Sequence, residues 1–252
     1  MASFNQSSPS QNSSLGNLTY QKLPFIRRLQ IKLNQITSYI PPPPSKHRHR
    51  RILLVHSHPV QDSFANAISN RIEQSSSQGG HECQRINLHD GYQSNLSESE
   101  RKIYFSPQSD GTLERDVREN LKLLHWCDTL IFVYPTWWMN TPASLKGFFD
   151  RTLLPYKTWD FPATSKNMLD SPGLVPLLSN IRDIIGVSTY GASQSVVTLA
   201  GDNGRRMISN GIRPIMNKDC TLAWLGLYNM DIQTLEGRIE FLLQVDRLIK
   251  TL

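Results

Sequence analysis

Residues 128–151 decide the fold class and read Asp128-Thr-Leu-Ile-Phe-Val-Tyr-Pro-Thr-Trp-Trp-Met-Asn-Thr-Pro-Ala-Ser-Leu-Lys-Gly-Phe-Phe-Asp-Arg151. Residues 130–134 are all apolar or aromatic, which is typical of a parallel strand covered on both faces. After a short aromatic loop, Thr141 is predicted to cap a helix, with Pro142 in its first turn. The apolar residues of that helix recur at helical spacing: Leu145, Phe148, Phe149 and Leu153.

From residue 51 onward the chain alternates between predicted strands and helices. The other predicted strands lie at 52–55, 84–88, 181–188 and 221–228. Predicted helices begin at Asp62 or Ser63 and at Ser97, and others cover 113–126, 195–209 with a break at Gly201, and 235–252. Strands that alternate with helices indicate a parallel sheet with right-handed crossovers. The predicted fold class is therefore α/β: a doubly wound, five-stranded parallel sheet with helices on both faces.

The positive charge of the chain is concentrated at its N-terminus. Residues 1–50 contain seven Lys and Arg residues and neither Asp nor Glu. The other 20 basic residues are matched by 21 acidic residues in 51–252, so the formal net charge of +6 lies in the first 50 residues. The high isoelectric point is thus no indication of a nucleic-acid surface on the folded part.

We expect two parts, a basic arm over residues 1–50 and a folded domain over 51–252. Residues 1–20 are rich in Ser, Asn and Gln, which predicts disorder, and Pro41–Pro44 form a stiff spacer. Between them, apolar residues recur at helical spacing: Leu29, Leu33, Ile36 and Ile40. This composition resembles an organelle transit peptide, and it equally fits an exposed tail or a helix docked on a partner subunit.

The three cysteines favour a reduced intracellular compartment, because Cys83, Cys127 and Cys220 form no Cys-x-x-Cys pair. No apolar run is long enough to predict a transmembrane helix. The predicted location is the cytoplasm, with organelle import through the basic arm as the alternative.

The loop after the first strand leads into a helix N-terminus, where free amides and the helix dipole favour an anion. Ser63 offers a hydroxyl there, and His58 a hydrogen-bond donor or a cation. The chain has neither a Gly-x-Gly-x-x-Gly nor a Gly-x-x-x-x-Gly-Lys-Ser/Thr motif, which argues against a Rossmann dinucleotide site and a P-loop. His56 and His58 lack a nearby carboxylate or cysteine pattern, so no metal site is predicted.

Two further loops follow buried strands. Trp137 and Trp138 stand at the carboxyl end of a strand, where open α/β sheets bind ligands, so they indicate a flat aromatic ligand. The alternative is that both are ordinary packing residues. Residues 186–193 read Gly-Val-Ser-Thr-Tyr-Gly-Ala-Ser and are expected beside the tryptophans if the two strands are neighbours. They form no Gly-x-Ser-x-Gly elbow, so the main signal of a serine hydrolase is missing.

Together these loops resemble the flavodoxin-like NAD(P)H:quinone oxidoreductase family, which also includes ancillary subunits of potassium-efflux systems. The resemblance covers residues 51–252. It rests on His58-Pro-Val-Gln-Asp-Ser-Phe64, Tyr134-Pro-Thr-Trp-Trp138, Pro142-Ala-Ser-Leu-Lys-Gly-Phe-Phe-Asp-Arg151, Gly186-Val-Ser-Thr-Tyr-Gly191, Leu88-His-Asp-Gly-Tyr92 and Trp224-Leu-Gly-Leu-Tyr-Asn-Met-Asp231.

The resemblance implies a role for each loop in holding FMN or FAD. The phosphate end would be held by His58, Ser63 and Phe64. The isoalloxazine edge would be lined by Pro135, Thr136, Trp137, Trp138 and Met139. The pyrimidine side would be bonded by Ser188, Thr189, Tyr190 and Gly191.

The chain departs from the family in the residues that assist proton transfer. The best-known members have a glycine where Tyr190 stands, and a Tyr and a His shortly after it. Here residues 194–202 read Gln-Ser-Val-Val-Thr-Leu-Ala-Gly-Asp and contain neither. The catalytic residue is therefore unassigned, and Tyr190 is its one candidate.

The function implied is that of an NAD(P)H dehydrogenase (quinone). Hydride would pass from NAD(P)H through bound FMN or FAD to a quinone or similar acceptor, with ping-pong kinetics. The resemblance also implies a homodimer, for which Tyr156, Trp159 and Phe161 would supply apolar surface. The alternative is a non-catalytic flavin- or nucleotide-binding regulatory subunit of a membrane or protein partner.

Overall fold

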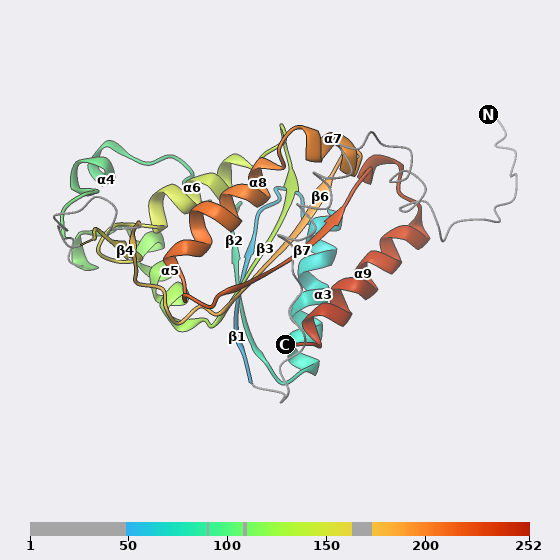
Figure 1. The fold of residues 1–252 in the computed structure, drawn as a ribbon, viewed down its shortest axis with the longest axis horizontal. Helices are drawn as coiled ribbons and strands as arrows, with labels where there is room; N and C mark the ends of the chain where they lie inside the picture. Colours follow the sequence, from blue (N-terminus) through green and yellow to red (C-terminus); the bar gives the residue numbers. More distant parts are fainter. Residues whose placement is uncertain (1–48, 90, 108–109, 163–172) are drawn as a thin grey trace, which may run out of the picture.

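The computed structural model describes residues 49–89, 91–107, 110–162 and 173–252. The predictions for residues 1–48 lie outside the described residues. Five parallel strands form the central sheet in the order β2-β1-β3-β6-β7 (Figure 1). Their bounds are β1 Arg51–His56, β2 Glu82–Asn87, β3 Thr129–Thr136, β6 Asp183–Tyr190 and β7 Thr221–Leu227. The predicted five-stranded parallel sheet is confirmed, with strand ends within two residues of the predicted ones.

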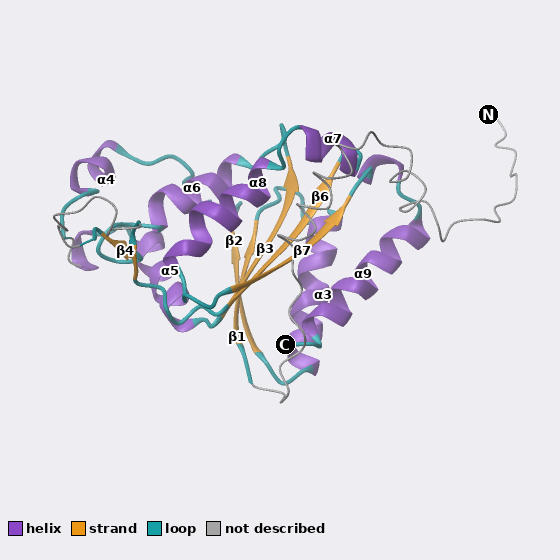
Figure 2. Ribbon diagram, in the orientation of Figure 1, coloured by secondary structure: helices purple, strands orange, loops and turns teal. Residues whose placement is uncertain are grey.

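Helices cover both faces of the sheet, as Figure 2 shows. One face carries α3 (Phe64–Gln78) and α9 (Leu235–Ile249), and the other carries α5 (Arg115–Trp126), α6 (Ala143–Thr152) and α8 (Asn203–Arg206). Shorter elements are α4 (Glu98–Ile103), α7 (Gln194–Leu199), the 3-10 turns η1 (Asp110–Thr112), η3 (Arg213–Ile215) and η4 (Met230–Ile232), the π-helix η2 (Met207–Ile212), and the small pair β4 (Trp159–Asp160) and β5 (Val175–Pro176).

One predicted helix start is wrong. Thr141 does not cap α6, because Pro142 occupies the N-cap position and makes no side-chain capping bond. The Thr141 amide instead donates to the Asn140 side chain at 2.8 Å, which belongs to the preceding tight turn. Of the two candidates for the first helix, the cap is Ser63, whose hydroxyl accepts from the Asn66 amide.

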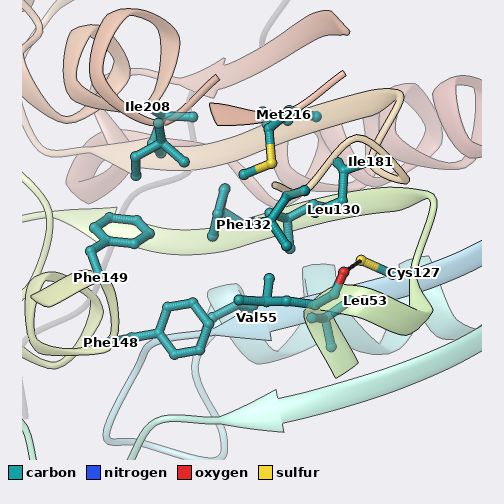
Figure 3. Packing of buried hydrophobic residues seen from close by; sticks show 14 of the residues in the cluster. Leu53, Val55, Cys127, Leu130, Phe132, Phe148, Phe149, Ile181, Ile208 and Met216 are labelled. Carbon is teal, nitrogen blue, oxygen red and sulfur yellow. Dashed lines mark hydrogen bonds between the residues drawn. The ribbon is translucent and has the colours of Figure 1, made fainter. Parts of the chain in front are cut away.

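The all-apolar β3 strand is explained by two core layers. Phe132 points into the layer under α5 and α6, where Phe148 and Phe149 also pack (Figure 3). Tyr134 belongs to the same layer. Ile131 and Val133 alternate to the opposite layer, under α3 and α9. Because successive strand residues point to opposite faces, a strand covered on both faces needs apolar side chains at every position.

The chain enters the domain at a fixed point beside its own C-terminus. The Arg50 side chain is buried, forms an ion pair with Asp183 at 3.1 Å, and donates to the Leu252 carbonyl at 3.4 Å. Arg50 therefore ties the start of β1 to the last residues after α9. No helix of the described part is both long and apolar enough to cross a membrane.

Candidate functional site at the carboxyl edge of the sheet

Three loops meet at the carboxyl edge of the sheet because β1, β3 and β6 are neighbours. The Ser57 amide donates to the Val133 carbonyl at 2.9 Å, and the hydroxyls of Thr136 and Ser188 lie 2.9 Å apart. The expectation that the loop after β6 lies beside the tryptophan loop is confirmed, since Thr136 pairs with Tyr190. Ligands of open α/β sheets bind at this edge.

The first loop delivers the N-terminus of α3. The first turn of this helix contains no acidic residue. The Ser63 hydroxyl accepts a hydrogen bond from the Asn66 amide at 3.1 Å. The amides that precede Asn66 in this turn have no partner within the helix. The Phe64 ring faces away from the edge and lies 6.3 Å from Phe241 in the layer under α9. Phe64 therefore offers its backbone amide, rather than its ring, to an anion at this position.

His58 stands between this helix and the tryptophan loop. Its ring centroid lies 6.1 Å from that of Trp137. The Val60 amide donates to its Nδ1 at 3.0 Å, and Nδ1 also lies 3.3 Å from the Val60 carbonyl. Burial lowers the pKa of the ring, and the contact with the Val60 backbone opposes that shift. This side chain is thus a neutral hydrogen-bond donor near pH 7.

The tryptophan loop is a two-residue turn in a left-handed conformation. Trp137 and Asn140 exchange two backbone hydrogen bonds, at 3.1 and 3.0 Å, around Trp138 and Met139. The φ angles of Trp138 and Met139 are 50° and 58°, as in a type I′ turn, which normally takes Asn and Gly. Bulky residues in this region cost on the order of 1–3 kcal/mol each, and such strain is concentrated at functional sites.

The turn displays Trp138 to solvent. The relative exposure of Trp138 is 101%, and that of Trp137 is 43%. The alternative that both tryptophans are packing residues is therefore wrong for Trp138, which has no place in the core. A fully exposed indole on a strained turn is suited to stack on a flat ligand.

Helix α8 holds the tryptophan turn from behind. Asn203 donates to the Met139 carbonyl at 3.4 Å. Gly204 lies so close that an added Cβ would stand 2.8 Å from the Tyr134 hydroxyl and 3.3 Å from the Thr141 amide. The sequence prediction missed both residues; their signal was the Gly-Asp-Asn-Gly run at the helix break after Gly201.

The carboxyl end of β6 turns its side chains inward. The side chains of Ser188 and Thr189 are buried, so these residues present backbone groups at the edge of the sheet. The Tyr190 hydroxyl also lies in the interior, where it donates to Asp202 Oδ1 at 3.2 Å and accepts from Trp224 Nε1 at 3.1 Å. Burial raises the pKa of Tyr190 well above its usual value, so the hydroxyl keeps its proton at neutral pH.

Asp202 is a third residue that the sequence prediction missed. It is buried at the start of α8 with a φ of 45°, 3.8 Å from the Arg205 guanidinium. Burial raises its carboxyl pKa, and Arg205 opposes that rise. The hydroxyl of Tyr134 is buried nearby without a hydrogen-bond partner among the described residues. A polar cluster thus lies directly behind the loops after β3 and β6.

A hydrogen-bonded chain supports the edge on its β2 side. The hydroxyls of Ser57 and Ser144 lie 2.8 Å apart, and Ser144 Oγ lies 3.3 Å from His89 Nε2. His56 does not share the environment of His58, since it is buried with Nδ1 2.9 Å from the Ser69 hydroxyl. Burial, followed by the Arg85 charge, lowers the His56 pKa to about 3, so the ring is neutral and structural.

The aromatic residues expected at a subunit interface form one cluster. The Phe161 ring centroid lies 5.9 Å from that of Tyr156 and 5.3 Å from that of Trp159. Phe105 joins them at 6.4 Å from Phe161, and Phe105 and Phe161 are both about half exposed. The predicted homodimer stays a prediction.

Comparison with known proteins gives relatives in sequence. The chain is 34% identical over 110 residues to an uncharacterized NAD(P)H oxidoreductase of Haemophilus influenzae, covering 42% of this chain and 53% of that protein. It is 25% identical over 173 residues to the human ribosyldihydronicotinamide dehydrogenase (quinone), covering 62% of this chain and 69% of that protein. The matches span 31% to 53% of the length of three curated relatives.

Solved structures share the architecture. An NAD(P)H:quinone oxidoreductase from Methanothermobacter marburgensis matches with a TM-score of 0.65 at 22% identity, covering 81% of this chain and 96% of that chain. An FMN-dependent NADH-azoreductase from Bacillus anthracis, in complex with FMN, matches with a TM-score of 0.62 at 12% identity, covering 80% and 98%. At these identities the likeness shows the fold. A family model described as the flavodoxin-like fold matches residues 50–216, which is well over half of the sequence. The chain belongs to this flavodoxin-like family.

Proposed function

We propose that this protein is a flavin-dependent oxidoreductase that transfers hydride from NAD(P)H, through bound FMN or FAD, to a quinone or similar acceptor. The observation that carries the proposal is the strained turn that presents Trp138, fully exposed, next to the loop that leads into α3, where the His58 ring lies 6.1 Å from that of Trp137. A flavin cofactor combines a flat ring and a phosphate in one molecule. At this edge the tryptophan turn matches the ring, and the N-terminus of α3 matches the phosphate. The names of the relatives supply the reaction class.

We assign the phosphate end of the flavin to the N-terminus of α3. The amides at its first turn and the neutral ring of His58 form a donor set, and that turn contains no acidic residue. Helix N-termini favour anions through these free amides and the helix dipole. Ser63 keeps this end ordered by capping it.

We assign the isoalloxazine ring of the flavin to the turn of residues 136–139 and to the carboxyl end of β6. Trp138 shields one side of the ring from water, while Trp137 packs near His58. Gly191 is the first residue beyond β6, and the backbone from Thr189 to Gly191 supplies donors to the pyrimidine edge. When bound, the flavin supplies the hydride chemistry, and the protein orients it.

The test is the cofactor and turnover of the purified full-length protein. The absorption spectrum and the mass of the released cofactor identify FMN or FAD. Oxidation of NADH or NADPH is then followed with benzoquinone, and parallel double-reciprocal plots indicate ping-pong kinetics. A colourless protein that binds neither added FMN nor FAD refutes the proposal.

The second candidate is a flavin-bearing regulatory subunit, which the exclusion of Tyr190 from the open edge favours. It shares the flavin but not the reaction. Flavin bound at full occupancy without NAD(P)H turnover, tested across several quinones, supports this candidate and contradicts the enzyme.

A further inference from the structure

The segment after β7 lies against the loop after β6 at the carboxyl edge of the sheet. These two strands are parallel neighbours, so both end at this edge (Figure 1). The rings of Tyr190 and Tyr228 stack with their centroids 4.6 Å apart and their planes at 15°. The Asn229 amide then donates to the Ala192 carbonyl at 3.1 Å. The stacked rings and this hydrogen bond fix the start of η4 beside the loop.

A carboxylate of this segment stands beside Gly191. A Cβ at Gly191 would lie 3.1 Å from Asp231 Oδ2. Gly191 does not have a positive φ angle, so its backbone conformation does not require glycine. The missing side chain instead leaves the space beside which the Asp231 carboxylate lies.

The charge of Asp231 is not neutralised by the part of the chain that the structure describes. Asp231 is exposed, and no described residue forms an ion pair or a hydrogen bond with its carboxylate. Asp202 differs in both respects, since it is buried and interacts with Tyr190 and Arg205. Asp231 is thus an acidic group that faces solvent at the open edge with its full charge.

The position of this charge matters for the proposed flavin. In the proposed function, backbone donors from residues 189–191 bind the pyrimidine edge of the ring. Reduction of a flavin places additional negative charge on that edge, which the backbone donors stabilise. A carboxylate beside the same backbone opposes this charge, because like charges at close range repel. Charges near the ring are one of the means by which a protein tunes the electronics of its cofactor.

We propose that Asp231 sets the redox balance of the bound flavin, by disfavouring its reduced form relative to its oxidised form. A reduced flavin that is less stable passes its electrons to the acceptor more readily. The effect is electrostatic, so no bond is formed or broken at Asp231. This inference rests on the proposed function, since it requires a flavin at this edge.

A redox titration of the full-length protein with its bound flavin tests the effect. The flavin is equilibrated under anaerobic conditions with a reference dye of known potential, and both absorption spectra are followed. Asp231→Asn removes the charge and keeps the size of the side chain. The equilibrium constant for flavin reduction is expected to rise roughly 3- to 10-fold, the size of one charge removed at close range. A tenfold change corresponds to about 30 mV for a two-electron couple.

Two further variants serve as controls for the charge. Asp231→Glu keeps the carboxylate and is expected to retain the wild-type reduction constant within about twofold. Asp219→Asn removes an exposed carboxylate just before β7, at the opposite edge of the sheet, and is expected to leave the constant unchanged. The difference between wild type and Asp231→Asn should also shrink in about 1 M salt, because salt screens exposed charges.

Three results overturn the inference. The first is an unchanged reduction constant in Asp231→Asn, and the second is an equal change in Asp219→Asn. The third is an altered KM for anthraquinone-2-sulfonate in Asp231→Asn with an unchanged reduction constant, which means that Asp231 meets the acceptor rather than the flavin. Each of these results leaves the proposed function standing. A wild-type protein that binds neither FMN nor FAD refutes the proposed function, and the inference with it.

Discussion

The Tyr190 hydroxyl lies 3.2 Å from Asp202 Oδ1, and this bond joins the end of β6 to the start of α8. Trp224 and Arg205 complete the surroundings of the pair. Since α8 also holds the tryptophan turn through Asn203, the pair connects two of the three site loops. Asp202 is thus a positioning residue, buried behind the edge rather than open to it.

The first prediction concerns the pH dependence of Asp202. Burial raises its pKa in the folded protein above the unfolded value, so the folded state binds this proton more tightly. The stability it contributes is present below the unfolded pKa and is lost as pH rises through the folded pKa. Asp202→Asn keeps an acceptor for Tyr190 and does not titrate, so wild type should become less stable relative to the variant as pH rises from 4 to 7, measured by urea unfolding.

The matched control is Asp219→Asn, which removes an exposed carboxylate. Its stability difference from wild type should vary less with pH. A stability difference between wild type and Asp202→Asn that is constant over this pH range would falsify the first prediction.

The second prediction concerns acid stability through His56. Its pKa is lowered to about 3 by burial and then by Arg85, so the folded state favours the neutral ring. The stability this contributes is present above the unfolded pKa and is lost as pH falls from about 6.5 toward 3, at up to roughly 1.4 kcal/mol per pH unit. His56→Asn, which can still bond Ser69, should flatten this part of the pH–stability curve. The exposed His125→Asn should leave the slope in place, and a similar slope in both variants would argue against a buried neutral His56.

The third prediction separates the ring of Trp138 from its backbone. Both Trp138→Ala and Trp138→Gly remove the indole, so each should weaken flavin binding about 2- to 10-fold, the size of an aromatic stacking contribution. Only glycine relieves the left-handed backbone, so Trp138→Gly should also raise stability over Trp138→Ala by about 1 kcal/mol. Flavin titration and thermal unfolding measure the two effects; unchanged flavin affinity in both variants would exclude Trp138 from the site.

The fourth prediction concerns the packing of β6 on β7. A Cβ at Gly186 would lie 2.1 Å from the Trp224 ring, so Gly186→Ala must displace the indole that bonds Tyr190. Overpacking of this kind costs about 1–3 kcal/mol and sometimes more. At Gly211 a Cβ meets nothing within 4 Å, so Gly211→Ala should have little effect. Equal denaturation midpoints for the two variants would contradict this packing.

The sequence by itself determined the fold class and the edge of the sheet that carries the site. The uninterrupted apolar run at 130–134 requires a strand covered on both faces, and periodic helices between such runs permit few other sheets. The residues after each strand were therefore assignable to one edge. Thr141 was misassigned as a cap because its neighbour Asn140 closes the preceding turn, a choice between two local bonds that propensity does not resolve.

The tertiary structure alone decided which way the site side chains face and what supports them. Trp138 is exposed because two consecutive left-handed residues turn it outward, a conformation that its residue type disfavours. Tyr190 faces inward because Asp202 at the start of α8 and Trp224 and Tyr228 of the β7 segment provide bonds and a stacking surface. Such contacts join residues far apart in the chain, and their free energy depends on burial and distance, which the order of residues does not specify.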